Sequence, residues 1–152
     1  MIFKVNPYLY PLDYSKYSNN INEKYIEIIK KDDKNKMIIS CIDNDKNNIT
    51  SFIIYRKIIL KSEIKFIILL ISVHEDFRNN GYGKIILDEF VEYIKQLKTK
   101  KIINIIVHPL DSSEYFFINY GFVKIEKSRF LKDYEGWKLN SDKLIYKLCI
   151  MS

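Results

Sequence analysis

The residues with the clearest chemical potential form a short loop from Arg78 to Lys84, with the sequence RNNGYGK. Gly81 and Gly83 lack a Cβ, so a ligand can approach their backbone closely. An apolar run ends shortly before the loop and an amphipathic run begins at its end. The start of a helix presents unpaired N–H groups and a partial positive charge. The order of strand, glycine loop and helix therefore predicts a diphosphate site, and the alternative is an ordinary turn that needs glycine only for its backbone angles.

Two other glycine loops that bind phosphates have spacings that this chain lacks. The Walker A loop requires G-x-x-x-x-G-K-[ST], and the dinucleotide loop requires G-x-G-x-x-G in the first strand-to-helix unit. The chain has only four glycines, and they fit neither pattern. The loop that begins at Arg78 therefore represents another kind of diphosphate site.

The loop lies between a predicted buried strand and a predicted amphipathic helix. Residues 64–73 are almost continuously apolar, which is typical of a central strand covered on both faces. Residues 84–98 carry apolar side chains at helical spacing, namely Ile86, Phe90, Val91, Ile94 and Leu97. Residues 102–107 follow this helix as another apolar strand, so we expect them to run parallel to residues 64–73.

The remaining segments predict a mixed α/β (α+β) sheet of six or seven strands flanked by helices, in a single domain over residues 1–152. Residues 36–42 and 49–60, with the strand at 64–73, predict an antiparallel meander of three strands. After a short apolar start at residues 2–5, residues 20–31 predict a helix. Asp111 and Glu114 have the spacing of a capping box, and Gly121 is placed to end the helix that they begin. Residues 122–127 and 144–150 complete the sheet.

Composition limits the class of protein. The chain is 47% hydrophobic and 29% charged, as in ordinary globular proteins. No apolar run approaches the roughly 20 residues needed to cross a bilayer, and the first residues do not resemble a secretory signal. We therefore expect an intracellular protein that is not bound to a membrane. Cys41 and Cys149 lie in apolar stretches, so we expect buried free thiols and neither a disulfide nor a metal site.

The formal net charge of +6 suits anionic partners. The chain has 22 lysines against 3 arginines, together with many Ile, Asn and Tyr residues, a bias typical of an AT-rich genome. The lysines are scattered, and the one short cluster, at residues 98–101, falls where the end of a helix favours cations. Nucleic acid is therefore an unlikely partner.

The motif R-x-x-G-x-G between an apolar strand and a helix resembles the acetyl-CoA pyrophosphate loop of the GNAT superfamily of N-acetyltransferases. The predicted order of elements is also similar to theirs. The sequence YFFINYGF at residues 115–122 is similar to the family's aromatic-aromatic-x-x-x-G-F segment, so the resemblance covers residues 64–122. Tyr82 between the glycines, this segment and KDYEG at residues 132–136 also resemble the histone acetyltransferase branch.

The resemblance implies acetyl-CoA as co-substrate, with no metal. It implies that Val73 pairs with the pantetheine chain, that the amide of Ile71 faces the thioester carbonyl, and that Phe117 lies near the sulfur. An amide directed at a developing oxyanion stabilises the transition state by on the order of 3 kcal/mol. The pyrophosphate would be held by backbone amides of seven residues: Arg78, Asn79, Asn80, Gly81, Tyr82, Gly83 and Lys84.

The chain departs from the family at both positions that carry acid–base chemistry. Many members have a tyrosine acid where this chain has Phe117, and the histone-type members have a glutamate base where it has Ile67. Releasing a thiolate of pKa 8.5 unassisted at pH 7 costs about 2 kcal/mol, whereas deprotonating an amine of pKa 10.4 costs about 4.6 kcal/mol. The reaction therefore depends more on a general base than on a general acid.

His108, at the end of the strand at 102–107, is our first candidate for that base, because imidazole accepts protons near neutral pH. The alternative is a strand-end histidine that is only hydrogen-bonded to backbone. Three carboxylates are also possible bases, although charges in a solvated loop explain them better: Glu63, Glu75 and Asp76. Two tyrosines could replace the missing acid or could only pack: Tyr115 and Tyr120.

Together these features predict an N-acetyltransferase that moves an acetyl group directly to a primary amine. Through the histone-type resemblance, protein lysine is favoured over an N-terminus or a small amine. Two alternatives stay open. One is an inactive CoA-binding module, because Phe117 and Ile67 lack acid–base groups, and the other is a basic nucleic-acid-binding domain. We expect a monomer or a homodimer.

Overall fold

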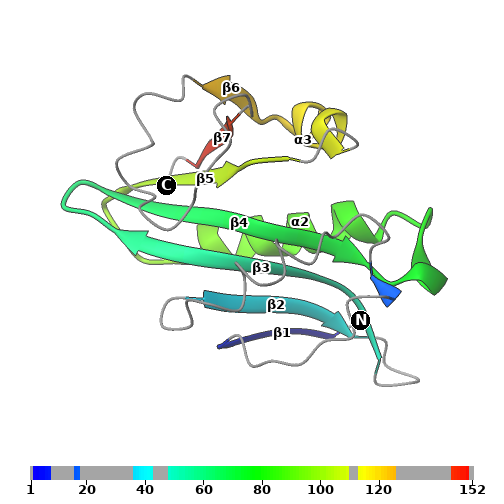
Figure 1. The fold of residues 1–152 in the computed structure, drawn as a ribbon. Coiled ribbons are helices and arrows are strands. Elements are labelled where there is room, and N and C mark those ends of the chain that lie inside the picture. The colour runs from blue at the N-terminus through cyan, green and yellow to red at the C-terminus, as the bar shows by residue number, and fades with distance from the viewer. Residues whose placement is uncertain are drawn as a thin grey trace.

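A computed structural model describes residues 2–7, 16–17, 36–42, 48–109, 113–125 and 145–150 of the chain. In these ranges, seven strands form one mixed sheet in the order β1-β2-β3-β4-β5-β7-β6 (Figure 1). The strands are Ile2–Pro7 (β1), Lys36–Ile42 (β2), Ile49–Ile59 (β3), Glu63–Val73 (β4), Ile102–Val107 (β5), Val123–Ile125 (β6) and Ile145–Ile150 (β7). The helices are Tyr82–Lys95 (α2) and Glu114–Tyr120 (α3), with a 3-10 turn at Glu75–Phe77 (η2).

The first half of the sheet is an antiparallel meander. β2, β3 and β4 pair in succession, as the sequence predicted, and β1 extends the meander at its edge. β3 and β4 are eleven residues long, about twice the usual strand length. Their length carries β4 well beyond the end of its other neighbour, β5.

The second half of the sheet contains the predicted parallel pair. β4 runs into α2 and returns as β5, parallel to β4. β7 then inserts between β5 and β6 and is antiparallel to both. The predicted strands at 122–127 and 144–150 are therefore confirmed, although the structure describes the first of them only as far as Ile125. Their order in the sheet had no signal in the sequence, because two adjacent short strands can join an edge in either order.

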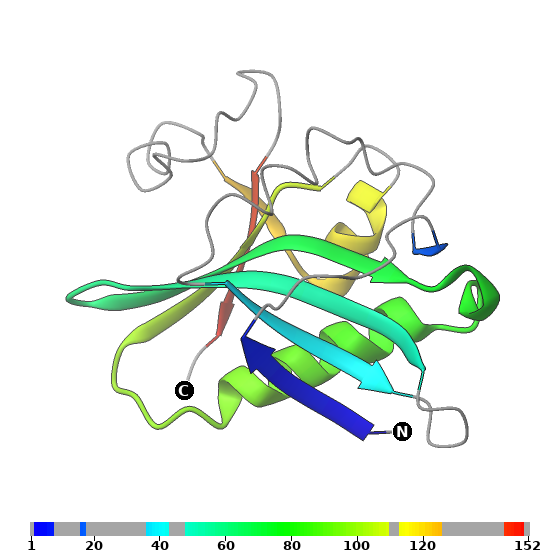
Figure 2. The same ribbon diagram turned by 60° about the horizontal axis from the view of Figure 1, so that its bottom comes forward.

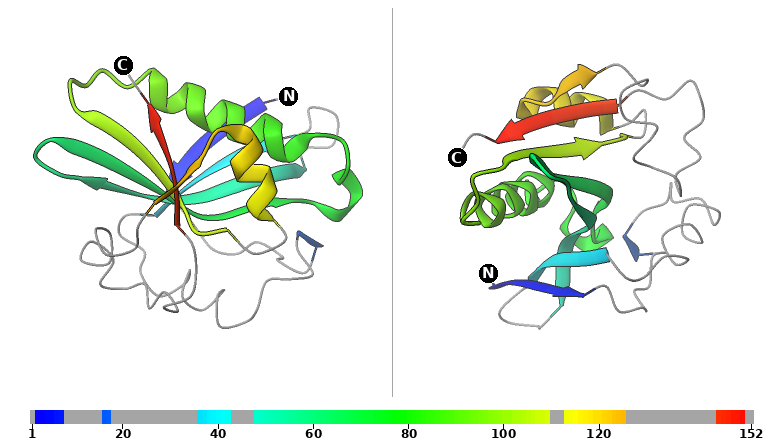
Figure 3. Two further views of the ribbon diagram at one scale, coloured as in Figure 1. Left: turned by 90° about the horizontal axis from the view of Figure 1, so that it is seen from above. Right: turned by 90° about the vertical axis from the view of Figure 1, so that its left-hand side faces the viewer.

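One face of the sheet is covered by α2, which lies along β2, β3 and β4 (Figure 2). The predicted apolar stripe is confirmed, since Ile86, Phe90, Val91 and Ile94 are all buried. The Phe90 ring packs against Tyr55, with a centroid distance of 4.8 Å. α3 lies on the same face, because Phe117 belongs to the same apolar cluster. The strands fan out with the twist that L-residues impose (Figure 3).

α3 begins at Glu114 behind Ser113, whose side chain makes no cap hydrogen bond. Glu114 accepts a hydrogen bond from the Tyr146 hydroxyl. One sequence prediction was wrong, because Cys149 is an exposed thiol and not a buried one. Cys41 is buried as expected.

Some predictions lie outside the described residues, namely the helix at 20–31, the capping box that begins at Asp111, and the KDYEG segment at 132–136. Gly121 does end α3, with a φ of 122°. Within the described ranges, no helix is long and apolar enough to cross a membrane.

Replacement of Phe90 by Ala should lower the free energy of unfolding by about 3–5 kcal/mol, because it removes a fully buried ring and leaves a cavity. Urea denaturation measures this change. The control is Glu92→Ala on the exposed face of the same helix, which should change stability by no more than about 0.5 kcal/mol. Equal effects of the two substitutions would contradict the assigned face of α2.

Candidate functional site

The candidate site begins where β4 parts from β5. Their parallel pairing ends at Ile68 and Val107, whereas β4 continues beside β3 as far as Val73. The register between β3 and β4 shifts at this point, so that Leu69 is an extra residue in β4. Such a bulge bends a strand and increases its twist. The last residues of β4 are therefore directed away from β5 (Figure 1).

Backbone groups of Ile71 and Val73 point toward the side that β5 has left. The His74 amide donates to the Thr50 carbonyl of β3 at 2.8 Å. Because successive residues of a strand direct their backbone groups to opposite sides, those of Val73 and Ile71 face away from β3. The Arg78 Nε donates to the Val73 carbonyl from that side, at 3.5 Å. The two residues predicted to pair with pantetheine and with the thioester thus have their amides on the open side of β4.

The loop after β4 is held in a compact form by local hydrogen bonds. The His74 Nδ1 accepts from the Asp76 amide at 3.1 Å and caps η2. The Asn80 side-chain amide donates to the Arg78 carbonyl at 3.1 Å. Asn79 has a φ of 64°, a left-handed conformation that asparagine tolerates better than most residues. These contacts turn the chain sharply from the end of β4 into α2.

The start of α2 presents a group of backbone donors. The Ile85 amide closes the first turn onto the Gly81 carbonyl at 3.0 Å, so the amides of residues 81–84 precede the intrahelical bonds. No side chain caps this end of the helix and no acidic residue lies in its first turn. An anion would satisfy these donors and would interact favourably with the helix dipole.

Glycine occupies the two positions of the loop for different structural reasons. Gly81 has a φ of 78°, which is unfavourable for residues with a Cβ. Gly83 has no such backbone angle, and a Cβ there would make only ordinary contacts, 3.8 Å from the Phe116 ring and 3.9 Å from Val73. The fold itself therefore does not require glycine at position 83. Close approach of a ligand to the backbone would explain it.

α3 provides the second wall of the site. Phe116 lies opposite Gly83, and Phe117 is buried against Phe116 and Phe122 with ring centroids 5.1 and 5.3 Å apart. Phe117 therefore lies within the core, one residue from the loop-facing Phe116. Phe116 was missed as a site residue, although its position in the aromatic segment was a usable signal.

Neither tyrosine of α3 is well placed as an acid. Tyr115 is 77% exposed. The Tyr120 hydroxyl donates to Asp88 of α2 at 2.8 Å. Burial and this carboxylate raise the pKa of Tyr120 well above its ordinary range, so it is a poor proton donor.

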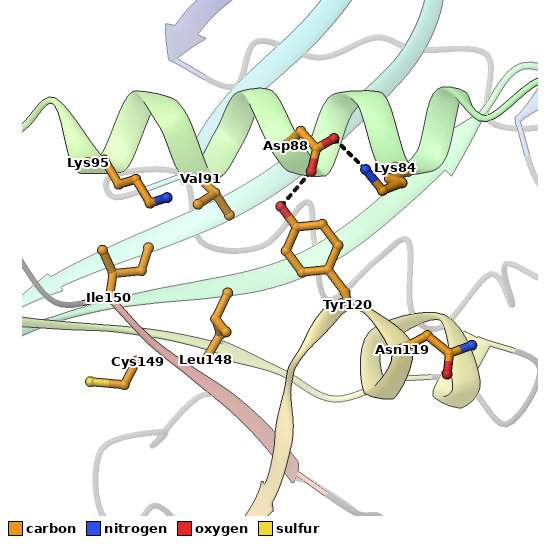
Figure 4. A pocket seen from close by; sticks show the side chains of 9 residues that line it. All are labelled: Lys84, Asp88, Val91, Lys95, Asn119, Tyr120, Leu148, Cys149 and Ile150. Carbon is orange, nitrogen blue, oxygen red and sulfur yellow. Dashed lines mark hydrogen bonds and ion pairs between the residues drawn. The ribbon is translucent and has the colours of Figure 1, made fainter.

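Asp88 also joins the loop to a cavity of about 430 Å³ between α2, the end of α3, and β7 (Figure 4). The Lys84 ammonium donates to Asp88 at 3.0 Å. Burial acts to raise the pKa of the Asp88 carboxyl, but the hydrogen bonds from Lys84 and Tyr120 outweigh it and lower that pKa. Asp88 is therefore ionised at neutral pH and holds Lys84 at the edge of the cavity.

His108 follows Val107, the last residue of β5 to pair with β4, and so lies where the two strands part. Its side chain is half-buried and its Nε2 is buried. Ile67 is fully buried. Glu63 is at the opposite end of β4, where it accepts from Asn104 at 2.9 Å, and is far from the loop. Of the candidate bases, His108 lies at the parting of the strands, while Glu75 and Asp76 lie in η2.

A row of aromatic rings packs along the loop and connects it to Tyr17. The His74 ring packs edge-on against Tyr17 and against Phe77, at centroid distances of 5.2 and 5.8 Å. Phe77 in turn packs against Tyr82 at 5.6 Å. The contact between Tyr17 and His74 joins residues far apart in the chain.

Among the described residues, no group of three His, Cys, Asp or Glu could hold a metal ion.

The sequence matches the model of the acetyltransferase (GNAT) family over residues 6–122. This range includes the loop, both described helices, the end of β1, and all of β2 to β5. None of the curated proteins matches the chain in sequence.

Solved structures share the fold at low sequence identity. An acetyltransferase of the GNAT family from Staphylococcus aureus Mu50 is 19% identical, with a TM-score of 0.62, and the match covers 99% of this chain and 100% of that one. Tetrahymena GCN5 is 14% identical, with a TM-score of 0.64 and coverages of 86% and 78%. The KacTA–DNA complex contains a chain that is 8% identical, with a TM-score of 0.61 and coverages of 97% and 93%.

Replacement of Gly81 and of Gly83 by alanine should have different effects on the free energy of unfolding of the ligand-free protein. Gly81→Ala should lower the free energy of unfolding by about 1–2 kcal/mol, because its φ is positive. Gly83→Ala should leave it unchanged or raise it by up to about 1 kcal/mol, because alanine favours the helix. Urea denaturation of both variants measures the difference, and a large loss of stability in Gly83→Ala would contradict the geometry described.

Proposed function

We propose that this chain, which belongs to the acetyltransferase (GNAT) family and is thus an acyltransferase, moves the acetyl group of acetyl-CoA directly to a primary amine. The observation that carries this proposal is the uncapped start of α2 behind β4. Gly83 is one of the residues whose backbone donors are exposed there, and the fold itself does not require glycine at that position.

The binding of acetyl-CoA would use mainly backbone groups. Amides from Arg78 to Lys84 would hold the pyrophosphate at the start of α2. Val73 and Ile71 have their amides on the open side of β4, where an extended pantetheine chain can pair with them as a further strand would. Coenzyme A supplies a thioester, whose carbonyl carbon is the electrophile.

In the proposed reaction, the amine nitrogen attacks the thioester carbonyl and forms a C–N bond. The Ile71 amide donates to the oxyanion that develops on the carbonyl oxygen. His108 accepts the proton that the ammonium group must lose, directly or through one water. The C–S bond then breaks and the thiolate leaves, while the second proton that the amine nitrogen loses passes to the departing thiolate or to water. Phe117 provides an apolar wall and no proton, which is tolerable because unassisted release of the thiolate costs only about 2 kcal/mol.

The acceptor is proposed as a primary amine, with protein lysine favoured over an N-terminus or a small amine. This preference rests on the resemblance of Tyr82 and the aromatic segment to the histone acetyltransferase branch. The fold likeness to Tetrahymena GCN5 agrees with it but, at 14% identity, does not identify an acceptor.

A CoA-binding module without activity is the second candidate. Phe117 and Ile67, at the two positions where relatives carry acid and base, are both buried apolar side chains. Turnover distinguishes the two candidates, because both would bind the coenzyme.

Acetyl-CoA at a hundredfold excess over its Kd should raise the free energy of unfolding by about 2.7 kcal/mol, which a thermal melt detects as a shift of several degrees. Gly83→Glu should fold normally, since an acidic residue suits the start of a helix. It should nevertheless weaken binding by tenfold or more, because its carboxylate would face the diphosphate.

The matched control is Ser62→Glu, which adds the same charge at an exposed turn at the other end of β4. It should bind acetyl-CoA like the unmodified chain. An absence of any shift with acetyl-CoA in the unmodified chain would rule out the coenzyme site.

His108→Ala should reduce turnover by about a hundredfold or more, as expected on loss of a general base, with little change in acetyl-CoA affinity. The release of free thiol with a panel of lysine peptides, N-terminal peptides and small amines measures turnover. Glu75→Gln and Asp76→Asn serve as controls and should retain activity. Unchanged turnover in His108→Ala would exclude this residue as the base.

A further inference from the structure

We propose that one end of the sheet, formed by the turn after β3 and the turn before β5, binds the surface of a membrane that contains anionic lipids. We call this end the basic tip and define it as residues 57–62 and 98–102. The two segments contain no acidic residue and five lysines, namely Lys57, Lys61, Lys98, Lys100 and Lys101. The inference does not depend on the proposed acetyl transfer, because the tip and the glycine loop lie at opposite ends of β4.

The fold brings the two lysine-bearing segments together. The Lys101 ammonium donates to the Leu60 carbonyl at 2.9 Å, although the two residues are 41 positions apart in the chain. The Ile102 amide donates to the Ser62 carbonyl at 3.4 Å. Both turns therefore lie at the same end of the sheet, on the left of Figure 1. In the sequence these lysines formed two short, separate groups, and only the fold makes one surface of them.

The positive charge of the tip is available to a partner. Lys61, Lys98 and Lys100 are exposed, and none of them forms an ion pair with another described residue. The nearest acidic residue in the chain, Glu63, accepts a hydrogen bond from Asn104 at 2.9 Å. Clustered charges of one sign attract an anionic partner more strongly than the same charges scattered over the surface.

Two exposed apolar side chains accompany these lysines. Ile59 is 61% exposed and Ile102 is 59% exposed. Nucleic acid would attract the lysines but offers little apolar surface to the isoleucines, and the tip has no arginine or aromatic residue to contact bases. The surface of an anionic bilayer suits both kinds of side chain, because its headgroups attract lysine and its acyl boundary takes up apolar groups.

The shape of this end of the molecule suits a flat partner. β3 continues beyond its last pairing with β2 at Arg56 and pairs only with β4 as far as Ile59. The hairpin therefore extends past the neighbouring strands, as Figure 2 shows on its left. A planar surface can approach the turn of this hairpin and the adjacent turn before β5 together.

This proposal revises the expectation that the chain is not bound to a membrane. That expectation came from the absence of an apolar run long enough to cross a bilayer, and a contact with the membrane surface needs no such run. β4 has eleven residues, so its ends lie about 33 Å apart. A membrane bound at the basic tip would leave the glycine loop open to solution.

Cosedimentation with lipid vesicles tests the proposal. The unmodified chain should bind vesicles of two parts phosphatidylcholine to one part phosphatidylserine on the order of a hundredfold more tightly than vesicles of phosphatidylcholine alone. Each lysine close to an anionic surface strengthens binding by about fivefold, and three are fully available. The difference should shrink as salt is added, because salt shortens the Debye length.

Charge reversal at the tip should remove this difference. The variant carries Lys61→Glu, Lys98→Glu and Lys100→Glu together, all at exposed positions. The matched control carries Lys4→Glu, Lys16→Glu and Lys124→Glu, which remove the same charge at exposed positions outside the tip. The control should keep most of its preference for anionic vesicles.

The isoleucines distinguish a membrane from nucleic acid. Ile59→Ser combined with Ile102→Ser should weaken vesicle binding by about tenfold, because less apolar surface is then buried. Urea denaturation checks that the variants remain folded.

Three outcomes would overturn the proposal: equal binding to both kinds of vesicle, equal losses in the tip variant and its control, or tighter binding to duplex DNA or RNA than to vesicles with no effect of the isoleucine substitutions. Acetyl-CoA should stabilise the tip variant and the unmodified chain equally. The proposed function would therefore stand if the membrane proposal failed, and the vesicle result would stand if acetyl-CoA did not bind.

Discussion

The site depends on one constraint, the extra residue Leu69 in β4. In a regular sheet, β4 and β5 would pair along their shared length and use each other's backbone groups. The bulge bends β4 away after Ile68, so the amides of Ile71 and Val73 face the side that β5 has left. The same bend directs the chain into α2 with its first amides uncapped. Strand and helix donors thereby form one surface that an extended, anionic ligand can satisfy.

The rest of the fold keeps these donors in place. Phe90 and its neighbours fix α2 against the central strands, and the aromatic row through His74 packs along the loop. The Tyr120–Asp88–Lys84 contacts tie α3 to the first turns of α2. Because Gly83 lies beside both Val73 and Phe116, the end of β4, the start of α2 and the middle of α3 meet at one point. Small shifts of any of them would change the space beside position 83.

The apolar residues Ile67 and Phe117 shape the chemistry that the site can perform. With no titratable group at either position, the proposed reaction needs a base from elsewhere in the chain. We propose His108 for this role because β5 ends where β4 bends away. The requirement for a base but not for an acid follows from the pKa difference between an amine and a thiol. This requirement is compatible with a site in which backbone amides provide most of the polar contacts.

The sequence by itself determined the local elements and the glycine loop. Hydrophobic periodicity marked β2 to β5 and α2 to within a few residues, and Gly121 marked the end of α3, because these signals depend on neighbours in the chain. The sequence did not determine the exposure of Cys149 or the place of β7 in the sheet. Only the tertiary structure decided that Leu69 forms a bulge, that Phe116 faces Gly83, and that Lys84 borders a cavity closed by β7. These features arise from contacts between segments far apart in the chain, whose pairing and packing leave no periodic trace in the sequence.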